Sequence, residues 1–160
     1  MKPLPEVGKE YHFFDDGKVS ASRHYICKVE RVITPEEANG IGVVVPEYNF
    51  ETGENEPCLT TLYNHYLSQM ESYDWLYSPE TDYFIEASCP TYDKDKLWFV
   101  RTLDGGWFSM NIQSSWQGGR LDVDGTIFDG LIKECEDEGH TDILELYKSA
   151  TYEKKQTIGA

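Results

Sequence analysis

The stretch KLWFVRTLDGGWFSMNI, residues 96–112, decides the fold class of this chain. Two runs rich in aromatic and β-branched residues flank an Asp-Gly pair. That pair favours a type I′ turn, because both central positions of the turn need positive φ. With Asp104 and Gly105 as the turn, Phe99 faces Met110 across a two-stranded hairpin. The face predicted to line the core consists of Leu97, Phe99, Leu103, Phe108, Met110 and Ile112.

The opposite face of the hairpin carries two tryptophans, Trp98 and Trp107, on the side that this register leaves in water. The other residues of that face are Val100, Thr102, Ser109 and Asn111. Exposed indoles on a sheet offer a surface to a peptide or a small molecule. We therefore keep this aromatic face as one candidate binding surface.

Alternation and helical periodicity predict further elements along the chain. Strands are predicted at residues 10–14, 23–33, 41–45 and 81–89, and a short helical turn at 35–38. Longer helices are predicted at residues 58–71, 126–138 and 141–150. Thr34 and Thr126 are expected to cap helices, the latter with Asp129 in a capping box, and Gly139 to end one. Residues 47–57 are expected to form an acidic, mobile loop.

These elements together predict one α+β domain over residues 1–160. The sheet is expected to be twisted, antiparallel and five- to six-stranded, with an SH3-like open barrel as the alternative form. Three main helices accompany it. Residues 34–78 are expected to form a helical insertion and residues 152–160 a frayed tail.

Charge is the extreme property of the chain, with 29 acidic residues, 14 basic residues and a net charge of −15. Residues 51–95 contain ten acidic residues against Lys94 alone, and residues 122–142 contain eight against Lys133 alone. The rest of the chain is nearly neutral. A surface of this sign repels nucleic acid and anionic membranes and attracts basic protein surfaces.

The sequence predicts a cytoplasmic protein with reduced thiols. No apolar run reaches the length of a membrane helix, and the first residues lack the apolar core of a secretory signal. The four cysteines are widely spaced and include no C-x-x-C pair, so neither a disulfide framework nor a zinc site is indicated. No two histidines stand three or four residues apart, as paired metal ligands on a helix would.

The sequence LDVDGT, residues 121–126, resembles the D-x-D-G-T motif of haloacid-dehalogenase-type phosphatases. In that family the first Asp attacks phosphorus, the second handles a proton, and both need Mg²⁺. There the motif ends a buried strand near the N-terminus, whereas here only 34 residues follow Thr126. We therefore interpret Asp122 and Asp124 as a turn before a helix. With no nucleotide-binding or zinc-protease motif elsewhere, we expect no enzyme, no metal and no cofactor.

Two groups of acidic residues are candidates for contact with a partner. Glu134, Glu136, Asp137 and Glu138 form the first and occupy the last turn of the helix predicted at residues 126–138. The helix dipole disfavours an exposed anion there by about 0.3–1 kcal/mol, so either solvation or a partner must favour the placement. Glu51, Glu54 and Glu56 form the second group.

Two functions remain open at this point. The first is a non-enzymatic binding or inhibitory protein whose acidic residues dock on a basic partner, such as a nucleic-acid-handling enzyme. In composition the chain is similar to phage anti-defence proteins, DNA mimics and toxin-immunity proteins. The second is a small scaffold that binds a ligand or peptide at the Trp98 and Trp107 face. Strong salt dependence of binding would favour the first function, because salt screens surface charges over about 8–10 Å.

Overall fold

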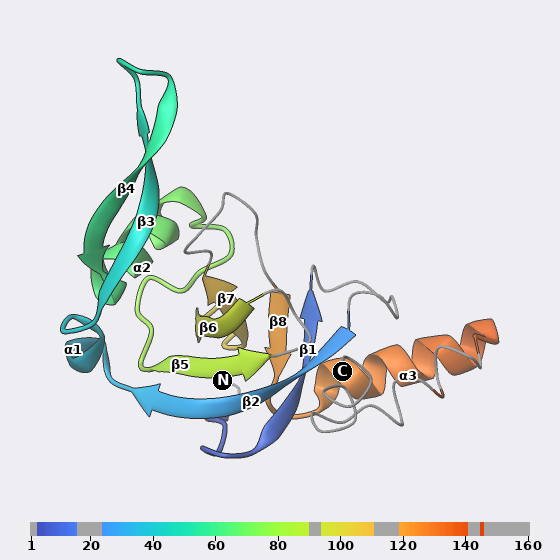
Figure 1. Cartoon of the computed structure of the whole chain (residues 1–160). Coiled ribbons are helices and arrows are strands. Elements are labelled where there is room, and N and C mark those ends of the chain that lie inside the picture. Colours follow the sequence, from blue (N-terminus) through green and yellow to red (C-terminus); the bar gives the residue numbers. More distant parts are fainter. Residues whose placement is uncertain (1–2, 16–23, 90–93, 111–118, 141–144, 146–160) are drawn as a thin grey trace.

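Six strands form a closed antiparallel barrel in the computed structural model of the chain (Figure 1). The structure describes residues 3–15, 24–89, 94–110, 119–140 and 145. In order around the barrel, the strands are β1 (Glu10–Asp15), β2 (His24–Ile33), β5 (Phe84–Cys89), β6 (Lys94–Arg101), β7 (Trp107–Met110) and β8 (Gly119–Asp122). The predicted antiparallel sheet is thus confirmed. Because β8 pairs with β1, however, the sheet is a closed barrel and not an open one.

A smaller unit is inserted in the chain between β2 and β5. It contains α1 (Pro35–Ala38), β3 (Gly42–Asn49), β4 (Glu54–Thr61) and α2 (Leu62–Ser72). The sequence predicts a helical insertion here, whereas β3 and β4 pair along their whole length as a separate two-stranded sheet. The expected loop at residues 47–57 is therefore wrong, because most of it belongs to these two strands. A third helix, α3 (Thr126–Glu138), follows β8.

The hairpin of β6 and β7 has a register one residue away from the predicted one. Phe99 pairs with Ser109, one residue before its predicted partner. The cause is a three-residue loop in place of a two-residue turn. The Thr102 N–H donates to the Gly106 carbonyl at 3.0 Å, and the Gly105 N–H donates to the Thr102 carbonyl at 2.9 Å. Gly105 has a φ of 82°, the left-handed conformation that ends such a loop.

A slip of one residue exchanges the two faces of one strand relative to the other. Phe99 and Trp107 therefore both point into the barrel, whereas Trp98 and Phe108 both lie on its outside. Trp98 is 2% exposed and Trp107 is 1% exposed. The prediction of one wet face on this hairpin is wrong, since both faces are buried.

Side chains from all six strands fill the interior of the barrel. They include Tyr11, Phe13, Cys27, Val29, Ile85, Ala87, Cys89, Leu97, Phe99, Trp107 and Leu121. A second apolar cluster lies between the outside of the barrel and the helices of the insertion, and it contains Ile33, Ala38, Leu62, Tyr66, Phe84, Trp98, Val100, Phe108 and Met110. Each fully buried large side chain contributes about 1.5–3 kcal/mol, so these two clusters hold the barrel and the insertion together.

Helix starts follow the capping residues more closely than the apolar stripes. Thr34 caps α1, as predicted, and it also forms a full capping box with Glu37. The helix predicted from residue 58 begins at Leu62, because Thr61 is its cap and accepts a hydrogen bond from the Asn64 N–H. Leu59, assigned by periodicity to the helical stripe, lies instead on β4 and is exposed.

The start of α3 differs from the prediction. Gly125, and not Thr126, is the N-cap residue, and it has a φ of 80° and no side-chain cap. The carboxylate of Asp122 takes that role and accepts hydrogen bonds from the Ile127 N–H at 3.1 Å and the Phe128 N–H at 2.8 Å. Gly139 ends the helix in the left-handed conformation, as predicted. Except for residue 145, the predicted helix at 141–150 and the tail at 152–160 lie outside the described residues.

Candidate binding surfaces

Most residues of the hairpin formed by β3 and β4, residues 42–61, are exposed, and we call this hairpin the arm. It projects away from the barrel at the top left of Figure 1. Only its base is packed: Val43 and the preceding Ile41 contact the apolar cluster under α1 and α2. An isolated pair of strands is at best marginally stable in water. The outer half of the arm therefore lacks the packing that usually supports a sheet.

One face of the arm is apolar and points to solvent. Val44 pairs with Leu59, Pro46 with Pro57, and Tyr48 with Asn55, which places all six residues on the same face. Val44 is 54% exposed, Tyr48 51% and Leu59 76%. A strand pair normally turns such residues toward a core. We call Val44, Pro46, Tyr48, Phe50, Pro57 and Leu59 the arm face.

The loop at the tip of the arm is ordered by Asn49. Its side-chain oxygen accepts hydrogen bonds from the Glu51 N–H at 2.8 Å and the Thr52 N–H at 3.3 Å, and its carbonyl accepts one from the Gly53 N–H at 2.8 Å. Phe50 sits in this ordered loop and is 90% exposed. Its ring meets the Tyr48 ring edge to face, with the centroids 4.9 Å apart. The tip thus presents an aromatic side chain to solvent from a hydrogen-bonded loop.

The arm carries negative charge without compensation. Glu47, Glu51, Glu54 and Glu56 are all exposed, and residues 42–61 contain no Lys or Arg. Three of these residues, Glu51, Glu54 and Glu56, are the predicted acidic group. Glu47 and Glu56 pair directly across the two strands on the face opposite the arm face. Like charges facing each other across a sheet are destabilising, and the hydrogen bond that the Asn49 side-chain amide donates to Glu56 at 3.0 Å leaves that charge in place.

The second predicted acidic group lies elsewhere. Glu134, Glu136, Asp137 and Glu138 are exposed on the C-terminal turns of α3. In Figure 1 this helix extends to the right of the barrel, while the arm rises at the far left. The two acidic groups therefore lie at opposite ends of the molecule and do not form one surface. Glu138 contacts His140, with 3.2 Å between the Oε2 and Nε2 atoms.

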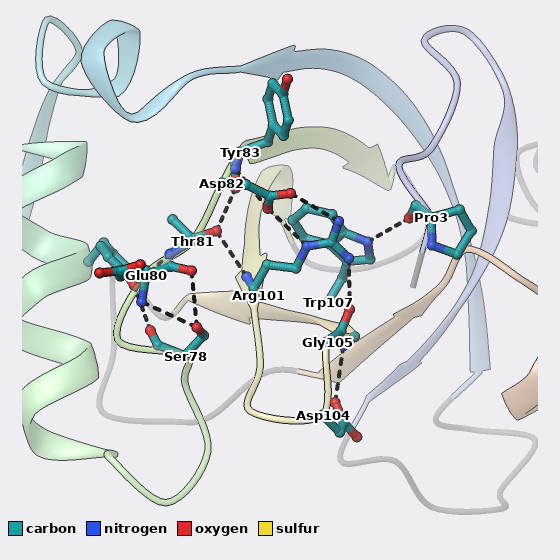
Figure 2. A network of polar contacts seen from close by, with 12 residues as sticks. Pro3, Ser78, Glu80, Thr81, Asp82, Tyr83, Arg101, Asp104, Gly105 and Trp107 are labelled. Carbon is teal, nitrogen blue, oxygen red and sulfur yellow. Dashed lines mark hydrogen bonds and ion pairs between the residues drawn. The ribbon is translucent and has the colours of Figure 1, made fainter. Parts of the chain in front are cut away.

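The predicted aromatic face does not exist as a surface, and Trp107 belongs to a buried polar network instead (Figure 2). The guanidinium of Arg101 lies 3.9 Å from the centre of the Trp107 ring. It donates to both carboxylate oxygens of Asp82, at 2.9 and 3.2 Å, and to the Gly105 carbonyl at 2.7 Å. The Trp107 indole N–H donates to the Pro3 carbonyl at 3.1 Å. These contacts fasten the hairpin loop, residue 82 and the N-terminal segment to one another.

The charges of Arg101 and Asp82 stabilise each other in this network. Burial by itself would raise the pKa of the Asp82 carboxyl, but hydrogen bonds and charge from Arg101 outweigh it and hold that pKa below its usual value. The Arg101 side chain is only 4% exposed. A buried guanidinium with a carboxylate, a carbonyl and an aromatic ring around it has its donors engaged. These contacts hold the fold together at this position.

The LDVDGT segment lines a pocket of about 190 Å³ beside the hairpin loop. Asp104, Trp107, Arg120, Asp122 and Asp124 contribute to its walls. Burial is the main cause that raises the pKa of Asp122, and the nearby acidic residues raise it further. The two backbone hydrogen bonds lower this pKa but do not outweigh burial. Both oxygens of Asp122 cap α3, and Asp124 accepts a hydrogen bond from the Thr126 N–H at 3.1 Å. The segment thus forms a turn into a helix, as interpreted from its sequence.

A pair of cysteines meets inside the barrel, which the sequence spacing did not reveal. Cys27 and Cys89 are fully buried on neighbouring strands and interact with each other. Burial first, and the neighbouring thiol second, raise the pKa of Cys27 well above its usual value. A thiol with a raised pKa is a poor nucleophile. The pair therefore acts as packing within the barrel.

Sequence reasoning also missed the arm, although its signal was present. Val43, Val44 and Val45 form a β-branched run, and Asn49 and Gly53 bracket a turn. Among the described residues, no group of three or more His, Cys, Asp or Glu side chains is arranged to hold a metal. In that same part of the chain, no helix is both long enough and apolar enough to cross a membrane.

No protein-family model, curated protein or solved structure matches the chain.

Proposed function

We propose that the chain is a non-enzymatic binding protein that docks its acidic surface on a basic surface of another protein, such as a nucleic-acid-handling enzyme. The observation that carries this proposal is the arm, a projecting element with four exposed glutamates and no basic residue. Opposite charges on two proteins raise the rate of encounter and select the partner. An inhibitory role of the anti-defence, DNA-mimic or immunity kind requires the same docking.

The proposal assigns first contact to the arm and not to α3. The two acidic groups lie at opposite ends of the molecule, so one compact basic surface meets only one of them at a time (Figure 1). The arm adds apolar residues to its charges, whereas the last turns of α3 present acids on a helix whose apolar side is packed on the barrel. The scaffold alternative has no comparable support, because its two tryptophans are buried.

Charge-neutral variants test the proposal against a partner purified from the host. Replacing Glu51, Glu54 and Glu56 with Gln should lower the association rate constant about tenfold at low salt and flatten its salt dependence. The matched variant replaces Glu134, Glu136 and Glu138 with Gln, and Asp137 with Asn, and should change the association rate by less than about twofold. Unchanged association kinetics in both variants would contradict the proposal, and a loss confined to the α3 variant would move the contact to that helix.

A further inference from the structure

We infer that the arm binds by laying its apolar face into an apolar groove of a protein whose rim is basic. This inference deepens the proposed function and rests on it. It concerns the arm face, meaning Val44, Pro46, Tyr48, Phe50, Pro57 and Leu59, and not the glutamates alone.

The arm face is unusual because it has neither a core beneath it nor a polar composition. Exposed apolar residues are ordinary when they are scattered singly, but a contiguous exposed group marks an interaction site. Val44 and Leu59 pair directly, and the tip continues the same face with the Tyr48 and Phe50 rings in contact. Four of the large apolar side chains that the structure exposes therefore lie together on one short hairpin.

The edges of the arm are closed to a further strand, which leaves the face as the docking surface. Pro46 and Pro57 stand opposite each other in the ladder, and neither has an N–H to give to a neighbouring strand. The Leu62 N–H donates to the Ile41 carbonyl, which makes residues 41 and 62 a hydrogen-bonded pair of this ladder. In an antiparallel ladder, such pairs alternate with pairs that exchange no hydrogen bond. Pro46 and Pro57 form one of the pairs without a hydrogen bond, so their backbone nitrogens face the two outer edges of the arm. Prolines on exposed edges prevent strand addition.

Phe50 has the properties of an anchor residue. It is almost fully exposed, while its loop is fixed by the Asn49 side chain and its ring is supported by Tyr48. A side chain that is already ordered loses little conformational entropy on binding. Large aromatic residues at the centre of a contact contribute most of the binding energy when they fill a pocket.

Charge decides which occupant fits this face. The arm carries four glutamates without a basic residue, and the whole chain has a net charge of −15. A second copy of the chain would bring like charges together, and nucleic acid or an anionic membrane would repel the arm. A protein groove with an apolar floor and Lys or Arg along its rim satisfies the arm face and the glutamates at once.

A photo-crosslinking amino acid at position 50 of the full-length chain identifies what the tip touches in host cells. The matched control carries the same group at position 75, where Trp75 is also exposed but lies off the arm. We expect a covalent adduct with a discrete protein from position 50 only. No adduct, an adduct with a second copy, or one with nucleic acid or lipid would each overturn the inference.

The partner identified in this way is then purified and titrated against defined variants. Replacing Val44, Phe50 and Leu59 with Thr should raise Kd about thirtyfold or more, mainly through faster dissociation, and leave the salt dependence intact. The control Trp75→Thr/Leu103→Thr removes two exposed apolar side chains elsewhere and should leave Kd unchanged. An unchanged Kd for the arm-face variant overturns the inference.

The two proposals fail in different ways. If the arm-face variant binds normally while the Glu51, Glu54 and Glu56 variant binds slowly, the acidic docking stands and the groove does not. If the arm-face variant loses affinity while the glutamate variant is unaffected, the apolar contact stands, but the basic rim of the groove and the electrostatic proposal are wrong. Circular dichroism of each variant is the control that its barrel is folded, and a comparison counts only between folded variants.

Discussion

Two arginines of the barrel occupy similar sites and differ mainly in exposure. Arg101 pairs with Asp82 and lies 3.9 Å from the Trp107 ring centre, while Arg31 pairs with a carboxylate at 2.8 Å and lies 5.5 Å from a tryptophan ring centre. The Arg31 side chain is 49% exposed and the Arg101 side chain 4%. Exposed ion pairs contribute little, whereas a buried guanidinium leaves its acceptors unpaired when it is lost.

We therefore expect Arg101→Lys to lower the free energy of unfolding by about 2–3 kcal/mol, because lysine cannot reach Asp82 and the Gly105 carbonyl together. The matched substitution Arg31→Lys should change it by less than about 0.5 kcal/mol. Urea denaturation followed by tryptophan fluorescence measures both values. Equal losses at the two positions would show that the Arg101 network of Figure 2 stabilises the fold no more than an exposed ion pair does.

The limits of prediction from sequence are clearest at Gly105. The Asp-Gly pair indicates a hairpin, and a hairpin is present. Whether the loop has two or three residues depends on hydrogen bonds at Thr102 and Gly106, which local sequence does not determine. The difference of one residue turned Trp107 from a predicted surface residue into a barrel core residue. Strand identity could thus be predicted, but burial could not.

At the scale of elements, the arm explains a second group of errors. Pro46 reads as the end of a strand and the glutamates after it as a loop, because proline and clustered charge are rare in the middle of a sheet. Both are tolerated in a two-stranded ribbon, where every position is an edge. The prediction also placed Leu59 in the helix at residues 58–71, because its spacing fits the apolar side of that helix. Leu59 lies instead on β4 and faces solvent. Apolar residues that face solvent break the usual pattern of apolar residues in the core, and such exceptions are expected at binding sites.

We expect the two arm prolines to keep the chain from self-associating. Replacing Pro46 and Pro57 with Val restores an N–H to each outer edge and extends a β-prone, apolar ribbon, which favours pairing between chains. Light scattering during size-exclusion chromatography should show larger species that grow with concentration. Pro79→Val, at an exposed position outside the strands, is the control and should remain like the wild type. A monomeric double variant would mean that the arm edges are protected by something other than proline.

At the scale of the whole molecule, charge works against folding. With 29 acidic and 14 basic residues, 15 acidic side chains have no Lys or Arg left to pair with. The Lys and Arg ion pairs among the described residues lie on the barrel, at Arg31, Lys96, Arg101 and Arg120, and not on the arm. Net charge of one sign disfavours the compact state through repulsion.

Salt should therefore stabilise this protein, contrary to its usual effect on a fold held by surface ion pairs. Raising NaCl from about 10 mM to about 300 mM, which shortens the screening length several-fold, should raise Tm by about 4 °C, roughly 1 kcal/mol for a chain of this size. Neutralising both predicted acidic groups removes seven negative charges and changes the net charge from −15 to −8. That variant should melt higher than the wild type at low salt and respond less to added salt.

Differential scanning calorimetry of both proteins across the salt series separates repulsion from general salt effects. A non-specific effect of salt on apolar burial acts equally on the two proteins, whereas screened repulsion makes their Tm values converge as salt rises. Parallel curves, or a wild-type Tm that falls with salt, would show that the acidic residues do not oppose folding. Convergence would show that the chain carries its acidic residues at a cost in stability, which either their solvation or a partner must offset.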